Sequence, residues 1–125
     1  MGEKKSYKLS KEEKAKGQIE YATQLIVEQA RMNGWKQIGF TTSSKSDRAL
    51  KTIAECVKEL GKKDELETQI LETLTQYPKN VFEAEKCDTV VFVERYAYCK
   101  YSELETCLEL MKKHNVSVLG VITYR

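Results

Sequence analysis

The sequence is poor in residues that bind metals or stiffen loops. It has one proline, one tryptophan and one histidine, His114. The four cysteines are scattered without a CxxC pair, at Cys56, Cys87, Cys99 and Cys107. Because His114 has no second ligand at a suitable spacing, we expect neither a metal site nor a disulfide framework. Cys56 and Cys107 fall on the apolar sides of expected helices and should be reduced core residues.

Long apolar runs are also missing. No stretch approaches the length of a membrane span, and the first residues lack the apolar core of a signal peptide. We therefore expect a cytoplasmic protein without direct membrane insertion. The formal net charge of +2 is too small to indicate binding to nucleic acid.

The composition is that of one globular domain. The chain has 125 residues, of which 41% are hydrophobic and 32% charged, enough for an ordinary buried core. The first sixteen residues are rich in lysine balanced by glutamate, which predicts a flexible N-terminal tail at 1–16. A single α/β domain should then occupy 17–125.

Hydrophobic periodicity predicts alternating strands and helices. Apolar residues at three- and four-residue steps indicate helices, and short runs rich in β-branched residues indicate strands. In the last third, a strand, a helix and a second strand follow one another, so the two strands should be parallel and joined by a crossover. The expected helices are 16–33, 47–60 and 102–114, and the expected strands are 35–42, 90–93 and 116–122.

The segment 62–77 is ambiguous. Its local pattern slightly favours a helix, because Asp64 and Glu67 have the spacing of a capping box. A strand at 68–73 is the alternative, and it would widen the sheet. We adopt the strand, followed by a short helix at 80–86. The predicted fold is a small three-layer α/β domain with about four parallel strands and flanking helices.

A site should lie at the carboxyl edge of this sheet, where ligands of open α/β sheets bind. The segments expected there are 41–47, 72–75, 95–101 and 124–125. The first, TTSSKSD, joins a strand to a helix, which is the position of a phosphate-binding loop. However, no glycine lies between Gly39 and Gly61, and such loops need glycine to curl their N–H groups around phosphate. A polar turn with a helix cap is the alternative.

These patterns give two sets of candidate residues. The candidates for binding an anion or a nucleotide are Thr42, Ser43, Ser44, Lys45, Ser46 and Glu72. The candidates for binding a protein partner are Arg95, Tyr96, Tyr98, Lys100 and Tyr101, because tyrosine and arginine contribute strongly to interfaces. Some of these tyrosines could instead simply cover the sheet edge. No Ser-His-Asp or Cys-His arrangement supports a catalytic residue.

The chain resembles a known family in several of its strands. Cys87-Asp88, VVFVER, the serine-capped helix and VLGVI at 118–122 are similar to the C-terminal part of bacterial tyrosine autokinases of capsule and exopolysaccharide synthesis, which belong to the MinD/ParA-like P-loop ATPases. More faintly, EYATQLIVEQARMNGWKQIGFTTSS resembles the helix and first strand before that family's Walker A loop. ILET at 70–73 resembles its acid-bearing strand. The resemblance implies a P-loop-like or Rossmann-like fold.

The departures from the family pattern change what the resemblance implies about activity. SSKSD stands where the family has its glycine-rich loop, the aspartate-bearing second strand is missing, and Glu72 stands in place of an aspartate. Phosphoryl transfer depends on these parts. The resemblance therefore implies a pseudokinase-like domain, without catalysis or cofactor, that acts by protein binding or regulation. Its partner would be a membrane polysaccharide-export component or a second copy of the chain.

An enzyme remains the alternative hypothesis. It would be a divergent ATPase or tyrosine kinase that holds Mg-ATP with Lys45, Ser46 and Glu72. A plain self-associating structural module is a third possibility. The sequence leaves open the partner, the oligomeric state and any phosphorylation of the tyrosines.

Overall fold

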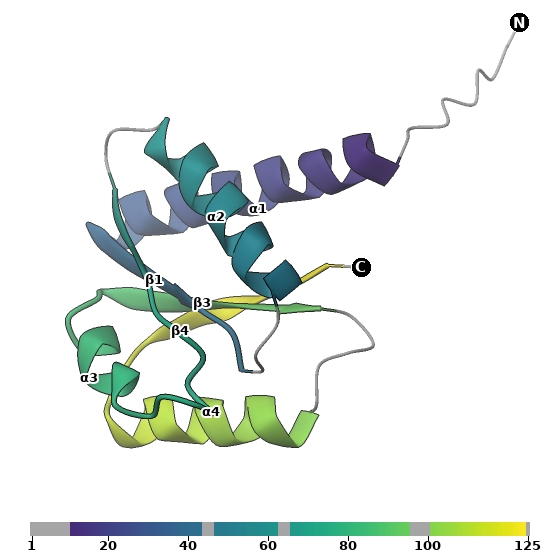
Figure 1. Ribbon diagram of the computed structural model, residues 1–125. Coiled ribbons are helices and arrows are strands. Elements are labelled where there is room, and N and C mark those ends of the chain that lie inside the picture. The colour runs from purple at the N-terminus through teal and green to yellow at the C-terminus, as the bar shows by residue number, and fades with distance from the viewer. Residues whose placement is uncertain (1–10, 44–46, 63–65, 96–100, 125) are drawn as a thin grey trace, which may run out of the picture.

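The chain folds as alternating helices and strands in a computed structural model that describes residues 11–43, 47–62, 66–95 and 101–124 (Figure 1). The elements are α1 (Lys11–Asn33), β1 (Gln37–Thr41), α2 (Asp47–Gly61), β2 (Glu67–Ile70), α3 (Asn80–Ala84), β3 (Thr89–Arg95), α4 (Tyr101–Lys113) and β4 (Val118–Tyr124). Within the described ranges, none of the helices has the length and apolar content that a membrane crossing requires.

The strands form one parallel sheet. In the described part of the chain it has four strands in the order β2-β1-β3-β4, and every neighbouring pair is parallel. The predicted α/β fold with about four parallel strands is therefore confirmed. The β3–β4 ladder also contains a register shift between Val90 and Val91.

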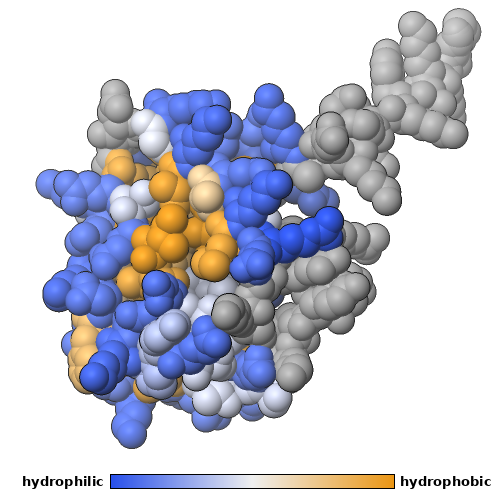
Figure 2. Space-filling view, viewed as in Figure 1, coloured by the Kyte–Doolittle hydropathy of each residue, from blue (hydrophilic) through white to orange (hydrophobic). Residues whose placement is uncertain are grey.

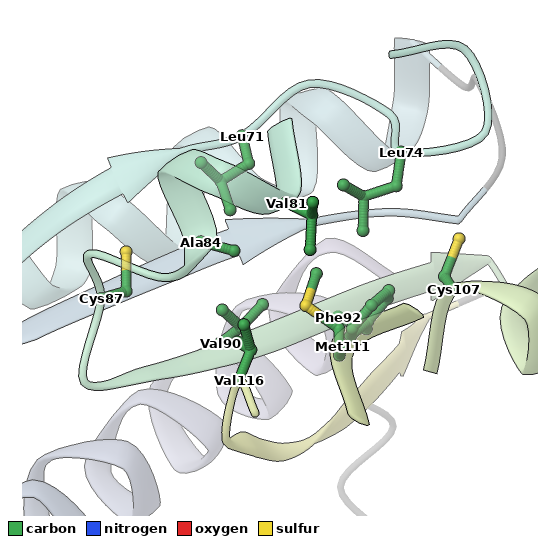
Figure 3. Packing of buried hydrophobic residues seen from close by; sticks show 10 residues of the cluster. All are labelled: Leu71, Leu74, Val81, Ala84, Cys87, Val90, Phe92, Cys107, Met111 and Val116. Atoms are coloured by element: carbon green, nitrogen blue, oxygen red, sulfur yellow. The ribbon is translucent and has the colours of Figure 1, made fainter. Parts of the chain in front are cut away.

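Helices cover both faces of the sheet and give the predicted three layers (Figure 1). The helices α1 and α2 pack on one face, in a cluster that includes Ile26, Ile53 and Phe40. On the other face, α3 and α4 pack in a second cluster (Figure 3) that includes Val81 and Met111. Both clusters are needed because a parallel sheet must bury its two faces.

Successive side chains of β3 enter the two clusters in alternation. Val90 and Phe92 belong to the cluster under α3 and α4, whereas Val91 and Val93 belong to the cluster under α1 and α2. Successive side chains of a strand point to opposite faces, so a continuous apolar run is the expected sequence of a central strand buried on both sides. This is the physical reason why the run was recognisable without a structure.

The ambiguous segment forms a strand, as we predicted, but β2 spans Glu67–Ile70 and ends three residues before the end of the predicted 68–73. It pairs with β1 in a register that places Gln37 opposite Glu67 at one end and Phe40 opposite Ile70 at the other. The local signal for a helix was overridden because β1 offers an unpaired edge on this side, and Leu71 then enters the core just after the strand. A short helix follows at α3, close to the predicted 80–86.

Two helices end where their sequences predicted. Gly34 follows α1 with φ 69°, and Asn115 follows α4 with φ 56°, which is the left-handed conformation that stops a helix. Two helix starts differ from the prediction. Helix α1 begins at Lys11, within the segment predicted as a tail, and α4 begins at Tyr101, which places Ser102 inside the first turn instead of before it.

Candidate functional site at the carboxyl edge of the sheet

The order of the strands creates a switch point between β1 and β3. Helix α2 follows β1 on one face of the sheet, whereas α4 follows β3 on the other face. The two connections therefore diverge at the carboxyl ends of neighbouring strands, which is where open α/β sheets bind their ligands. Of the segment predicted there, 41–47, the structure describes 41–43 and Asp47; the first three residues are buried and Asp47 is exposed.

A buried carboxylate that we had not predicted as a site residue occupies this switch point. Glu94, near the end of β3, is only 1% exposed. The backbone N–H of Ser43 donates a hydrogen bond to Glu94 Oε2 at 2.9 Å, and the Thr42 hydroxyl donates to the same oxygen at 3.0 Å. The Ser43 hydroxyl donates to Glu94 Oε1. Thr42 and Ser43 thus turn their polar groups inward, onto a carboxylate of the same chain.

These bonds explain how a charged group can be buried here. A carboxylate without partners in an apolar interior would be very costly. Hydrogen bonds to an ionised acceptor are shorter and stronger than neutral ones, and Thr42 and Ser43 supply both backbone and hydroxyl donors. Alternation along β3 was a signal for Glu94 in the sequence. Glu94 lies two residues after Phe92 and four after Val90, so its side chain points to the same buried face of the sheet.

The loop after β2 is bound to the same place. The Thr75 hydroxyl donates to Ser43 O at 2.8 Å, and the Thr41 hydroxyl donates to Glu72 O at 3.3 Å. Asn80 Nδ2 also donates to Glu72 O, at 3.3 Å. The segments after β1 and β2 therefore meet, as predicted, beside the end of β3. Glu72, however, takes part through its backbone, and its residue is exposed.

Several predicted site residues lie outside the described residues. These are Ser44, Lys45, Ser46, Tyr96, Tyr98 and Lys100; the side chain of Arg95 is not described either. Tyr101 opens α4 and is 77% exposed, as a contact residue for a partner would be. The assignment of these residues to a nucleotide or to a protein partner stays a prediction.

A hollow lies beside the loop after β2, between that loop and α4. Its volume is about 460 Å³, and its lining includes Leu74, Pro78, Cys107 and Leu110, with Thr75 and Lys113 among its polar groups. Thr75 also holds the Ser43 carbonyl, so the hollow adjoins the switch point. Its lining is mainly apolar, and its charged groups are Glu109 and Lys113.

The opposite, amino edge of the sheet carries a second carboxylate. Asp88, just before β3, is exposed, and its Oδ2 accepts hydrogen bonds from Lys36 N at 2.6 Å and Gln37 N at 2.9 Å. These two N–H groups lower the pKa of Asp88. His114 also lies on this side, at the end of α4, where its Nδ1 is 2.8 Å from Glu85 Oε1. His114 is thus far in the fold from the switch point.

The described cysteines behave as core residues. Cys56, Cys87 and Cys107 are free thiols and all are buried. Burial raises the pKa of Cys56 to about 11 and also raises that of Cys87, so both stay protonated near neutral pH. No cluster of three or more His, Cys, Asp or Glu side chains that could hold a metal ion occurs among the described residues.

Comparison of the chain with family models, with curated proteins and with solved structures gave no match.

Proposed function

We propose that this chain is a non-catalytic, pseudokinase-like α/β domain that acts by binding a protein and does not bind a nucleotide. The observation that supports this proposal is the position of Glu94. Its carboxylate takes the Ser43 N–H at 2.9 Å, in the loop where a phosphate-binding domain would direct its N–H groups toward the ligand.

The charge of Glu94 opposes a phosphate at the switch point. Two like unit charges about 5 Å apart repel by about 3 kcal/mol at an effective dielectric constant of about 20. A penalty of that size lowers affinity by more than about a hundredfold. A nucleotide carries several negative charges, and the Glu94 oxygens already accept hydrogen bonds from Thr42 and Ser43. Both facts disfavour a nucleotide at this position.

The protein-binding part of the proposal rests on the loop after β3. It leads from Arg95 to the exposed Tyr101, and its sequence is dense in tyrosine and basic residues. Such residues are enriched among the contacts that dominate interfaces. The kinship with polysaccharide-synthesis tyrosine autokinases, and an export component as the partner, are parts of this proposal that the sequence resemblance supports.

A titration with Mg-ATP, followed by ¹H–¹⁵N spectra, tests the proposal. We expect the amides of Thr42 and Ser43 to keep their chemical shifts up to millimolar nucleotide. The Lys45→Ala variant should likewise show no shifts when nucleotide is added, because no nucleotide is bound. Micromolar affinity that Lys45→Ala abolishes would establish the divergent ATPase or kinase instead.

A further inference from the structure

We propose that the open edge of β2, together with the apolar flank of α2 beside it, binds an extended peptide segment of a partner protein. The segment would carry apolar and basic residues in alternation. This inference rests on the proposed function, since it assumes that the domain acts by binding a protein, and it adds a second contact surface to the loop after β3.

The backbone of β2 is half unpaired. In the described structure β2 lies at one end of the strand order and pairs with β1. Glu67 N donates to Lys36 O, and Leu71 N donates to Phe40 O. Because the hydrogen-bonding groups alternate in direction along a strand, Thr68 and Ile70 direct their N–H and C=O groups away from β1. An exposed edge of this kind is a template for another strand.

An apolar surface lies next to this edge. It consists of side chains from α2 and β2, and we name it the edge patch: Leu50, Ala54, Val57, Leu66 and Ile70. Ile70 is 46% exposed and Leu50 is 36% exposed. Figure 2 shows a hydrophobic area where Figure 1 places α2 and β2.

The register assigns the edge patch to one face of the sheet. Ile70 lies opposite Phe40, and Phe40 belongs to the cluster under α1 and α2. Ile70 therefore points to the same side of the sheet as α2. A strand added beside β2 would place every second side chain on this face, against the edge patch.

The edge patch occupies the flank of α2 that faces away from α1. On the other flank is Glu59, whose pKa is lowered by a hydrogen bond from Lys62 and also by nearby charges that include Lys16 of α1. With 100° between successive residues of a helix, Leu50 and Ala54 lie on the side opposite Glu59. The packing of α1 therefore leaves this flank open.

The other face of β2 is polar and carries acidic groups. Gln69 Nε2 donates to Glu83 Oε2 at 3.3 Å, and Lys86 also contacts Glu83 at 3.4 Å. Glu67 points to this side as well and forms no ion pair among the described residues. An added strand would set its remaining side chains here, so charge complementarity favours lysine or arginine at these positions.

The size of the surface favours a short peptide over a second copy of the chain. Strand β2 has four residues, and a stable interface needs about 20–30 residues on each side. Antiparallel pairing of the β2 edges of two copies would involve far fewer residues on each side. A short extended segment, held by main-chain hydrogen bonds with side chains in alternate positions, fits this area.

The test is a ¹H–¹⁵N titration of the whole chain with a six-residue peptide of alternating valine and lysine, blocked at both ends. We expect shifts concentrated at the amides of Thr68 and Ile70. Ile70→Asp should weaken binding at least about tenfold, because the edge patch loses a large apolar side chain that is 46% exposed. Val121→Asp is the matched control: Val121 is 39% exposed on β4, the other edge strand, and its change should leave the affinity intact.

Two further probes separate main-chain pairing from charge. A peptide N-methylated at every residue should lose binding, since neither of its edges can donate hydrogen bonds to β2. A peptide of valine and glutamate should bind several-fold more weakly than the lysine peptide, and Glu67→Lys should reverse that order. Melting curves of both Asp variants verify that they are folded.

Several results would overturn the inference. These are unmoved Thr68 and Ile70 amides at millimolar lysine peptide, equal losses from Ile70→Asp and Val121→Asp, or undiminished binding of the N-methylated peptide. Sedimentation as a dimer with slow hydrogen exchange at Thr68 and Ile70 would assign the edge to a second copy. ATP binding in the earlier titration would refute the proposed function without moving these amides, so the two failures are distinguishable.

Discussion

Two carboxylates stand at the two ends of β3, and each one holds an end of β1. Asp88, before β3, accepts hydrogen bonds from the N–H groups of Lys36 and Gln37, whereas Glu94, at the other end, accepts from Ser43 N. Asp88 is exposed, but Glu94 is 1% exposed. A carboxylate that accepts backbone N–H groups therefore has two different roles. At the solvent-exposed amino edge, Asp88 completes the backbone hydrogen bonding of β1. At the carboxyl edge, Glu94 places a buried negative charge at the switch point.

The largest effect should come from removing the buried carboxylate. Glu94→Leu leaves the Ser43 N–H and the hydroxyls of Thr42 and Ser43 buried without their acceptor, and we expect a loss of about 3 kcal/mol in the free energy of unfolding. Urea denaturation measures it. Glu94→Gln keeps the shape and one acceptor oxygen, so it should lose about half as much. A Glu94→Leu variant as stable as the wild type would mean that burial of the charge cancels its hydrogen bonds.

A smaller loss of stability is expected from a substitution in β1, the strand whose two ends the carboxylates bind. A Cβ at Gly39 would lie 3.0 Å from Cys87 Sγ and 3.3 Å from Leu71 Cδ1. Gly39→Ala should therefore overpack this face of β1 and cost about 2 kcal/mol, read from the urea midpoint. Gly120→Ala is the control, because a Cβ there meets nothing within 4 Å and should change stability by less than about 0.5 kcal/mol. Equal effects of the two substitutions would show that close packing at Gly39 is unimportant.

The smallest effect should come from the exposed carboxylate. Asp88→Ala is expected to cost about 1 kcal/mol near neutral pH, since water replaces part of what the N–H groups of Lys36 and Gln37 lose. The pKa of Asp88 is lowered from its ordinary 3.8 in the folded state. Its contribution is thus present above pH 3.8 and is lost as the pH falls below that value, through the folded pKa. Unfolding at neutral and strongly acidic pH tests this, and a difference between variant and wild type that persists in acid would contradict it.

Local patterns were sufficient for most of the elements. Apolar periodicity placed α2 and α4, and the run at 90–93 identified β3, because these segments must bury one side or both sides whatever they pack against. Strand β2 was different. Its own residues slightly favoured a helix, and the unpaired edge of β1 decided the outcome, which is a property of the assembled sheet.

The candidate site was predictable in place but not in composition. A parallel sheet sends all its strand ends to one edge, so the meeting of the segments after β1 and β2 followed from the fold. The role of Glu94 did not, because its donors Thr42 and Ser43 are about fifty residues away along the chain, and no local spacing links them.

By itself the sequence determined the alternation of strands and helices and the parallel crossovers, since these depend on the pattern of neighbouring residues. It also determined that the loop after β1 lacks the glycines that a phosphate-binding loop needs, since these supply the required backbone freedom. Only the tertiary structure decided that Glu94 enters the switch point, that Asp88 holds the start of β1, and that the edge patch remains open beside β2. Each of these joins residues distant in the chain, and the free energy of such contacts depends on which surfaces folding brings together.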